Sequence, residues 1–391
     1  MKVVVVYLGT LGSLPPLISL IRLLRDIGST CEFVGVDSPS NRTVLAGLAV
    51  EHRLFACDLK RFSLRSCPFQ WFKAIFSNRY RRHAFRKAIS TTVLSMVGDS
   101  QDVIVWTVGA QVFELLHDFL LSLGRRHVNI SYELIEHRTS GGLKLVHDDI
   151  YRAATLVQCE PNRAEIFAGI YGLNRVPFVI PNCPYPHPRK RFLKVSNPAV
   201  DSVVSGWKDK IVFLYQGAVA CDRGGLVELL ERLCDAFPEA IVALMPSYTD
   251  GKYGTLLSKP NFYLLPSLPA PHHLEVTSHA TIGIATYCRG STGGLYSPLN
   301  VVYCAPNKIY EYAGFGIPML CNDLPGVRYV FEKFHTGVCY NDGDFDEAIN
   351  IVRSVLADYK RYEKSAVDYF SRIDLKKIVS DIVDSARRVN G

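Results

Sequence analysis

Short apolar runs alternate with amphipathic stretches along this chain of 391 residues, and the alternation occurs in two separate series. In the first series, an apolar run at residues 2–8 is followed by a Gly-containing turn and an amphipathic stretch reaching about residue 28. Further apolar runs lie at residues 31–36, 102–106, 127–132, 156–159 and 176–180. Continuous Val, Ile and Leu are typical of parallel strands covered on both faces. The first series therefore predicts a parallel sheet with right-handed helical crossovers.

The second series predicts another such sheet. Its apolar runs lie at residues 211–215, 240–245, 262–265, 282–285 and 317–321. A helix is expected from residue 225 to about 237, and two amphipathic helical stretches divided near Asp374 are expected over residues 346–390. The intervening residues 181–208 contain five prolines and a basic cluster at 189–191. Because Pro at this density disfavours both helix and central strand, we expect a semi-rigid hinge there.

The length of the chain suggests two domains. We place an N-terminal Rossmann-like domain at residues 1–185, a hinge linker at 186–208, a C-terminal Rossmann-like domain at 209–370 and a C-terminal helix at 371–391. The eleven cysteines form no CxxC pair and lie mostly in or beside apolar runs, so neither a zinc site nor a disulfide framework is expected. The first apolar run is too short for a signal peptide, and no run reaches transmembrane length, so a cytoplasmic protein is expected.

One segment carries the basic excess of the chain. Residues 60–87 hold nine Lys or Arg and no Asp or Glu, so the rest of the chain nets +7 − 9 = −2. Aromatic residues interleave with these cations, which fits an anionic membrane surface. The alternative is an amphipathic helix with core aromatics and solvated arginines. Nucleic acid is not an expected partner, because no RNA-binding signature accompanies the segment. The residues expected to form the membrane or acceptor surface are Arg65, Trp71, Phe72, Arg79, Arg81 and Arg82.

Residues 306–319 combine a helix start with two opposite charges. Pro306 and Asn307 can open a helix, and Lys308 and Glu311 are three residues apart on one helical face. A carboxylate, a cation and exposed backbone N–H groups suit a nucleotide sugar, with the cation and amides facing phosphate and Glu accepting from ribose hydroxyls. The alternative is a capped helix whose Lys and Glu form a solvated pair.

This segment resembles the donor-site helix of GT-B glycosyltransferases, most closely the retaining glycosyltransferase family 4. The resemblance covers nearly the whole chain and is strongest over residues 211–343. It implies an α/β fold of GT-B type: two Rossmann-like domains with parallel sheets facing across a cleft, and a C-terminal helix packing back toward the N-terminal domain. The first domain would bind the acceptor and the second the nucleotide sugar.

The resemblance also implies a donor site. In the family, a Gly-Arg pair is followed five residues later by Lys-Gly; here Arg223-Gly224 matches the second pair, and Ala218 replaces the first cation. The family's Glu-x7-Glu motif places its second Glu at Glu311, on the ribose, whereas its first position is Tyr303. The loop at residues 8–12 would border the donor phosphates, although it also reads as a tight turn needing Gly for positive φ. The expected donor-binding residues are Gly9, Gly12, Gly217, Arg223, Gly224, Tyr303, Asn307, Lys308 and Glu311.

Candidate catalytic residues follow a strand in the first domain. Glu133, Glu136 and His137 concentrate ionisable groups at its carboxyl end and are candidates for activating or orienting an acceptor hydroxyl. The alternative is a polar helix start. Further candidate sugar contacts are Arg289, Ser297 and Asn300, and Asn182 is interpreted as a structural residue of the hinge.

The resemblance implies a glycosyltransferase, with retention of configuration, that moves a sugar from a nucleotide-diphosphate sugar to a polysaccharide or lipid-linked glycan at the inner membrane face. No cofactor or metal is expected, because cations and helix N-termini would hold the diphosphate. Two alternatives remain open: a nucleotide-sugar epimerase on the same fold, and a non-catalytic GT-B subunit that binds donor or membrane for a partner.

Overall fold

The structure is a computed structural model. It describes residues 1–56, 85–98, 100–110, 112–134, 138–139, 142–143, 148–219, 225–249, 251, 253–287 and 299–388. Within these ranges the chain divides into two compact units. The first unit contains residues 1–133, 139–180 and 375–391, and the second contains residues 134–138 and 181–374.

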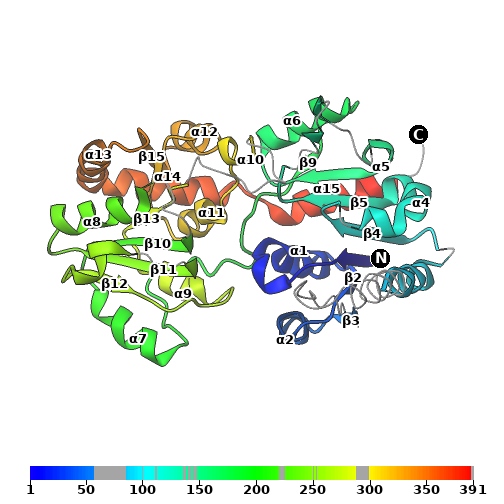
Figure 1. The fold of residues 1–391 in the computed structure, drawn as a ribbon, viewed down its shortest axis with the longest axis horizontal. Coiled ribbons are helices and arrows are strands. Elements are labelled where there is room, and N and C mark those ends of the chain that lie inside the picture. The colour runs from blue at the N-terminus through cyan, green and yellow to red at the C-terminus, as the bar shows by residue number, and fades with distance from the viewer. Residues whose placement is uncertain are drawn as a thin grey trace, which may run out of the picture. The chain divides into compact units, whose positions relative to one another are not determined.

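The first unit is built on a seven-stranded parallel sheet with the order β3-β2-β1-β4-β5-β8-β9 (Figure 1). The strand bounds are β1 Lys2–Tyr7, β2 Thr30–Val36, β3 Glu51–Phe55, β4 Val103–Val108, β5 His127–Ser131, β8 Thr155–Gln158 and β9 Phe178–Val179. Residues 3–6 of β1 are completely buried, as expected for a strand covered on both faces. A two-stranded sheet, β6 Arg138–Thr139 with β7 Gly142–Leu143, is separate from both large sheets.

Helices connect the strands of the first unit. Each of α1, α2 and α6 has Pro in its first turn, where the missing N–H costs nothing. The bounds are η1 Leu11–Ser13, α1 Pro15–Asp26, α2 Pro39–Leu48, a helix over 85–97, α4 Phe113–Leu123, η2 Gly124–Arg126, α5 Asp148–Ala153, α6 Pro161–Tyr171 and α15 Leu375–Arg387.

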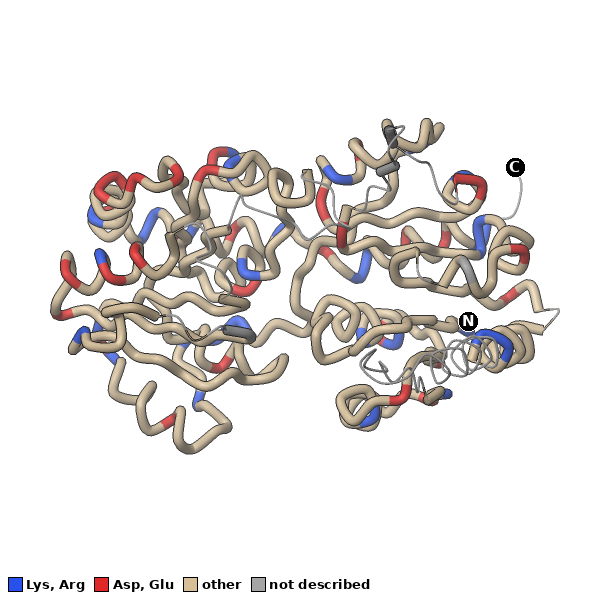
Figure 2. Tube along the Cα trace, viewed as in Figure 1, with Lys and Arg blue, Asp and Glu red and all other residues tan. Residues whose placement is uncertain are grey.

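The second unit is built on a six-stranded parallel sheet with the order β12-β11-β10-β13-β14-β15. The strand bounds are β10 Val212–Val219, β11 Ile241–Thr249, β12 Phe262–Leu264, β13 Ile282–Ile284, β14 Met319–Asn322 and β15 Gly337–Tyr340. These six strands carry no Lys, Arg, Asp or Glu, and charged residues lie on the surrounding helices and loops (Figure 2). This distribution is typical of a buried parallel sheet.

Helices pack around the second sheet, with α8 beside α13 (Figure 1). Leu226, Leu229, Leu230 and Leu233 of α8 are buried in one core cluster with Val352 of α13. The bounds are α7 Pro198–Val204, η3 Ser205–Trp207, α8 Leu226–Ala236, η5 Gly254–Ser258, α9 His273–Thr277, α10 Leu299–Val302, α11 Asn307–Ala313, α12 Pro325–Phe334, α13 Phe345–Ala357 and α14 Tyr359–Ser371.

The C-terminal helix α15 belongs to the first unit. Its apolar face is buried, including Val379 and Ile382. Lys376 lies 3.6 Å from Asp26 of α1, and Arg125 donates a hydrogen bond of 3.1 Å to Ser385. The chain thus starts and ends in the same unit, with its last helix packed against the elements of the first sheet.

The segment expected to be a hinge linker, residues 186–208, is packed on the second unit. Arg191 donates through Nε to Ser278 O at 2.8 Å and through Nη2 to Ala280 O at 2.6 Å. Pro198, expected to block a helix, instead begins α7, whose N-cap Asn197 accepts hydrogen bonds from two backbone N–H groups. Pro is compatible with the first turn of a helix, and here its position rather than its abundance decides the structure.

Within the described ranges, no helix is both long enough and apolar enough to span a membrane.

Candidate functional site

Lys308 and Glu311 lie on α11 and are both buried. They are 8% and 5% exposed, so the solvated ion pair that the sequence also allowed is excluded. Every residue of α11 from Lys308 to Ala313 is buried. Burial of charged side chains is costly unless they are paired or hydrogen-bonded. Their partners therefore decide what this site can do.

The Glu311 carboxylate is held by two side chains from other elements. Gln216, in β10, donates from Nε2 to Glu311 Oε2 at 2.6 Å. His273, the first residue of α9, contacts Glu311 Oε1 through Nε2 at 3.1 Å. Thr277 Oγ1, one turn later in α9, lies 2.5 Å from Gln216 Oε1. Strand β10 and helices α9 and α11 thus converge on one carboxylate.

These contacts keep Glu311 ionised. Burial raises the pKa of a carboxyl group, but the positive field and hydrogen bond of His273, the hydrogen bond from Gln216 and the charge of Lys308 outweigh it. The net result is a pKa of Glu311 below its usual value. The site therefore presents a negative charge with defined hydrogen-bond acceptors at neutral pH.

A second histidine holds the backbone of α11. His187 Nε2 lies 3.0 Å from Glu311 O, and His187 Nδ1 accepts from Arg189 N at 2.9 Å. Because Nδ1 accepts, Nε2 carries the proton and donates to the carbonyl. Burial lowers the pKa of His187 to about 4, which keeps the ring neutral. A Cβ on Gly314 would lie 2.4 Å from this ring, so α11 and His187 approach as closely as glycine allows.

Lys308 extends its ammonium between two aromatic rings. Nζ lies 4.5 Å from the ring centre of Tyr215 and 4.7 Å from that of Tyr287. Such cation–π contacts stabilise a desolvated cation. Within the ranges that the structure describes, Lys308 Nζ has neither an ion pair nor a hydrogen bond. An ammonium without such partners can bind an anionic group of a ligand.

Tyr287 is placed by a fully buried asparagine. Asn322, the last residue of β14, accepts from Tyr287 N at 2.9 Å and donates to Tyr287 O at 2.8 Å. Next to Tyr287, Thr286 is 1% exposed, and its hydroxyl has no hydrogen-bond partner among the described residues. Thr286 follows β13, which pairs with β10. A second group with unmet hydrogen-bonding capacity therefore lies at the carboxyl ends of these central strands.

Gly217 makes the approach of Lys308 possible. Its φ is +130°, and a Cβ there would lie 3.1 Å from Lys308 Cε and 3.3 Å from Nζ. The register of β10 against β11 shifts between Gly217 and Ala218. The predicted donor residues Gly217, Lys308 and Glu311 are thus close together in the second unit. The ligands of open parallel sheets bind beyond the carboxyl ends of the strands, which is where this group lies.

In the first unit, Gly9 and Gly12 follow β1. Asn41 fixes their loop: its Nδ2 donates to Gly9 O at 3.1 Å, and its Oδ1 accepts from Leu11 N at 2.7 Å. Neither glycine has positive φ, so the turn explanation based on φ is wrong. An added Cβ would lie 2.3 Å from Tyr7 Oη at Gly9 and 2.5 Å from Ser40 Oγ at Gly12, so those side-chain ends would have to move to admit it.

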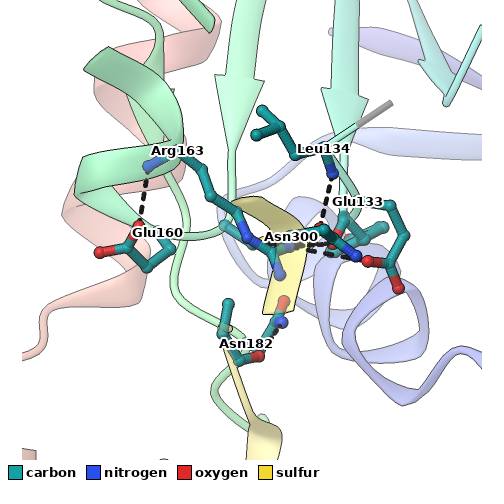
Figure 3. A network of polar contacts seen from close by, with 9 residues as sticks. Glu133, Leu134, Glu160, Arg163, Asn182 and Asn300 are labelled. Carbon is teal, nitrogen blue, oxygen red and sulfur yellow. Dashed lines mark hydrogen bonds and ion pairs between the residues drawn. The ribbon is translucent and has the colours of Figure 1, made fainter. Parts of the chain in front are cut away.

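Glu133 follows β5 and is half exposed. A buried arginine of α6, Arg163, approaches it with Nη1 at 3.7 Å from Oε2 and donates to Tyr132 O at 2.7 Å (Figure 3). Glu160, the N-cap of α6, accepts from Arg163 N at 2.8 Å. The carboxylate of Glu133 is therefore partly exposed, with a buried cation near one of its oxygens. This arrangement suits a group that binds a ligand hydroxyl.

Two predicted asparagines hold backbone groups of the second unit. Asn182 donates to Ala305 O at 2.8 Å and so fixes the turn before α11 (Figure 3). Asn300 in α10 accepts from Leu134 N at 2.8 Å. The structural role expected for Asn182 thus agrees with its hydrogen bond, and the amide of Asn300 is engaged by the protein itself.

The predicted donor residues Tyr303 and Asn307 lie on either side of this turn. Asn307 is the first residue of α11. Tyr303 follows α10 and is partly buried, and its backbone lies against Gly326 of α12, where an added Cβ would come within 2.8 Å of Tyr303 Cα. The close approach of α12 therefore fixes the position of Tyr303.

The remaining predicted residues lie outside the described ranges. They are Glu136, His137, Arg223, Gly224, Arg289, Ser297 and the basic surface residues Arg65, Trp71, Phe72, Arg79, Arg81 and Arg82. Three residues of the network were absent from the predicted set: Gln216, His273 and Thr277. Gln216 had a usable signal, because it is a polar residue that ends a predicted strand immediately before a glycine.

Comparison of the sequence with protein-family models and with curated protein sequences gives no match. The structure, in contrast, is similar to solved structures over its whole length. HepE from Anabaena in complex with UDP has a TM-score of 0.64 at 13% identity, with 100% of both chains covered. An E. coli structure described as trehalose-6-phosphate bound with UDP-2-fluoro glucose has a TM-score of 0.59 at 12% identity, again with 100% of both chains covered.

A third similar structure is WaaG, described as a glycosyltransferase involved in lipopolysaccharide biosynthesis. Its TM-score is 0.57 at 12% identity, with 98% of this chain and 99% of WaaG covered. Likeness at this identity concerns the fold, and it agrees with two parallel sheets of seven and six strands. The fold prediction is therefore confirmed: the chain has the GT-B fold.

Proposed function

We propose that the protein is a glycosyltransferase that moves a sugar from a nucleotide-diphosphate sugar to a hydroxyl group of a glycan. The observation that carries this proposal is the second-unit site: an ionised, buried Glu311 held by Gln216 and His273, beside Lys308 without an anionic partner among the described residues. A carboxylate and an ammonium three residues apart on one helix suit the ribose and the diphosphate of one ligand. The likeness to HepE, also solved with UDP-glucose, supports the same ligand class.

In this proposal Glu311 accepts hydrogen bonds from the ribose, and Lys308 pairs with the diphosphate. Arg223, which the sequence places beside the same strand end, would add a second cation. The bond between sugar C1 and the diphosphate oxygen breaks while the acceptor oxygen bonds to C1, and the acceptor proton passes to the leaving diphosphate. Fixed cations stabilise the charge that develops on that leaving group, so we propose a reaction without metal. We propose retention of configuration from the resemblance to the retaining glycosyltransferase family 4.

The acceptor would bind to the first unit. Glu133 is a candidate for orienting its hydroxyl because Arg163 supports the carboxylate from the buried side. Glu136 and His137 follow in sequence and remain candidates. We propose a polysaccharide or lipid-linked glycan as the acceptor, and the likeness to WaaG, described as acting in lipopolysaccharide biosynthesis, supports this class.

The donor site is tested by thermal unfolding with UDP-, GDP-, ADP- and TDP-sugars. A ligand at 100 times its dissociation constant stabilises a protein by about 2.7 kcal/mol, which raises the melting temperature of a chain of this length by about 3 °C. We expect such a shift with one of these donors, with or without EDTA. Glu311→Gln, Lys308→Met and Arg223→Ala should each remove most of it.

Two exposed residues provide matched controls for this measurement. Glu332→Gln on α12 and Lys360→Met on α14 change the same charges away from the site and should leave the shift intact. If no donor shifts the melting temperature, or if all three site variants retain the wild-type shift, the proposed donor site is wrong. Product NMR then identifies the reaction: a new sugar epimer without acceptor would indicate an epimerase, and donor binding without transfer or hydrolysis a non-catalytic subunit.

We further propose that the protein binds an anionic membrane surface as a peripheral protein. The support is the sequence of residues 60–87, with nine cations and no acidic residue. Each Lys or Arg near an anionic surface contributes about 1 kcal/mol. We expect co-sedimentation with vesicles containing anionic lipid and its loss when Arg79, Arg81 and Arg82 are changed to Gln. Equal binding to neutral vesicles, or binding to neither kind, would contradict this proposal.

A further inference from the structure

We infer that Gln216, Thr277 and His273 are positioning residues that hold the Glu311 carboxylate in one orientation and thereby make the donor site select ribose over 2′-deoxyribose. This inference rests on the proposed function, because it assigns the sugar class of the nucleotide at the same site. It predicts that the protein uses ribonucleotide donors and does not use TDP-sugars. Its basis is which group donates and which accepts in the hydrogen bonds that join these residues to Glu311.

The ionised Glu311 carboxylate sets the orientation of the Gln216 amide. A carboxylate can only accept, so the NH2 end of Gln216 faces Glu311, since the reversed amide would place its oxygen against a carboxylate, which is repulsive. The carbonyl end of the amide therefore faces Thr277, whose Oγ1 lies 2.5 Å from Gln216 Oε1 and 2.9 Å from the carbonyl oxygen of His273. Because Gln216 Oε1 accepts, the Thr277 hydroxyl donates to it and holds the amide in this orientation.

Glu311 then receives one hydrogen bond on each oxygen. Gln216 Nε2 occupies one acceptor position on Oε2 at 2.6 Å, and His273 Nε2 occupies one on Oε1 at 3.1 Å. Each carboxylate oxygen accepts about two hydrogen bonds, so one position on each oxygen is left unused by the residues that the structure describes. Only 7% of the Glu311 side chain is exposed, so bulk water hydrates these positions little. We infer that the ribose hydroxyls take them.

Two neighbouring acceptor positions on one carboxylate match a vicinal diol. A ribose supplies both the 2′ and the 3′ hydroxyl, whereas a 2′-deoxyribose supplies one and leaves a position on a buried anion unsatisfied. Sites built to hydrogen-bond a hydroxyl discriminate strongly against ligands that lack it. This selection requires that the carboxylate cannot rotate, and the hydrogen bonds from Gln216 and His273 prevent that rotation.

Calorimetric titration of the full chain with paired diphosphates tests the inference. The pairs are UDP and 2′-deoxy-UDP, ADP and 2′-deoxy-ADP, and GDP and 2′-deoxy-GDP. For the pair that binds, we expect the wild type to prefer the ribonucleotide by about tenfold or more, the size typical of one hydrogen bond to a charged group. Thr277→Val and Gln216→Met should each reduce this ratio severalfold.

A conservative variant distinguishes a positioning role of Thr277 from a general loss of structure. Thr277→Ser retains the hydroxyl and should keep the wild-type ratio. Thr255→Val removes a hydroxyl that donates to Glu231 at an exposed place on η5 and serves as the matched control. If neither these diphosphates nor TDP binds, the proposed function fails, and if TDP alone binds, the inference is overturned. If a ribonucleotide binds but its deoxy counterpart binds equally well, or if Thr277→Val and Gln216→Met leave the ratio unchanged, the inference alone is overturned.

Discussion

Gly217 shows how a single residue can determine the geometry of the candidate site. Its φ of +130° belongs to a region that residues with a Cβ rarely adopt, and an added Cβ would lie only 3.1 Å from Lys308 Cε and 3.3 Å from Nζ. The strand can therefore continue to Val219 while the lysine approaches its backbone. This is a steric reason for glycine, beyond the turn signal visible in the sequence.

We predict that Gly217→Ala destabilises the protein by about 1–3 kcal/mol, the usual cost of a backbone held in a strained region. It should also weaken nucleotide binding, because Lys308 must move. Urea unfolding and calorimetry measure the two effects. Gly169→Ala is the control, because Gly169 lies within α6 and an added Cβ there would have no heavy atom within 4 Å. This substitution should raise the free energy of unfolding by about 0.5–1 kcal/mol. A Gly217→Ala variant with wild-type stability and binding would contradict this account.

Residue patterns alone found part of the network. Lys308 and Glu311 are three apart in sequence, so the geometry of a helix is enough to place them on one face. Gln216, His273 and Thr277 lie far from Glu311 in sequence, and only the pairing of strands and the placement of α9 bring them to it. Sequence spacing contains no information on such contacts. The burial of Lys308 was likewise not predictable from the sequence. The rings of Tyr215 and Tyr287, which lie against its ammonium, come from distant parts of the chain.

At the scale of elements, the strands of both sheets were largely predictable because burial on both faces gives continuous apolar runs. The exceptions have physical reasons. The edge strand β3, residues 51–55, begins with three polar residues and has only two apolar ones, so it gives no continuous run. Strand β15, residues 337–340, is the edge strand of the second sheet and has only four residues. Edge strands are covered less and need fewer apolar residues.

The helices differ from the predicted ones where a break or a cap residue sets the helix boundary. Residues 346–390 form three helices, because a further break at Asp358 separates α13 from α14 in addition to the expected break near Asp374. Helix α11 ends at Ala313, and the turn after it is closed by Gly316, with φ +70°, and by Ile317 N, which donates to Tyr312 O at 3.0 Å. The proline-rich segment contains α7 and is held by the hydrogen bonds of Arg191 and by buried apolar residues such as Val195 and Trp207.

At the scale of the whole molecule, both units contain histidines that burial keeps neutral. Burial lowers the pKa of His127 in the first unit to about 3 and that of His187 in the second to about 4. Burial also lowers the pKa of His279, which contacts Leu193 O. In an unfolded chain these rings have an ordinary pKa of about 6.5. The unfolded state therefore binds protons that the folded state refuses below that pH.

We predict that the stability of both units falls as the pH falls from about 6.5 to 4. Each unit of pKa shift is worth about 1.4 kcal/mol, so His127 and His187 should each cost about 2 kcal/mol by pH 5. His117 opposes this trend, since Asp118 and Asp149 raise its pKa, but it lies in solvent. Urea midpoints at pH 7.5, 6 and 5 measure the effect. Midpoints that stay constant or rise toward pH 5 would contradict it.

The function of the whole molecule depends on where an activated nucleotide sits. The most direct test is a crystal structure of the protein soaked with the nucleoside diphosphate that binds most tightly. We predict density with the ribose hydroxyls at hydrogen-bond distance from Glu311 and the diphosphate beside Lys308 Nζ. A nucleotide bound elsewhere, with Glu311 and Lys308 left without ligand, would contradict the central claim.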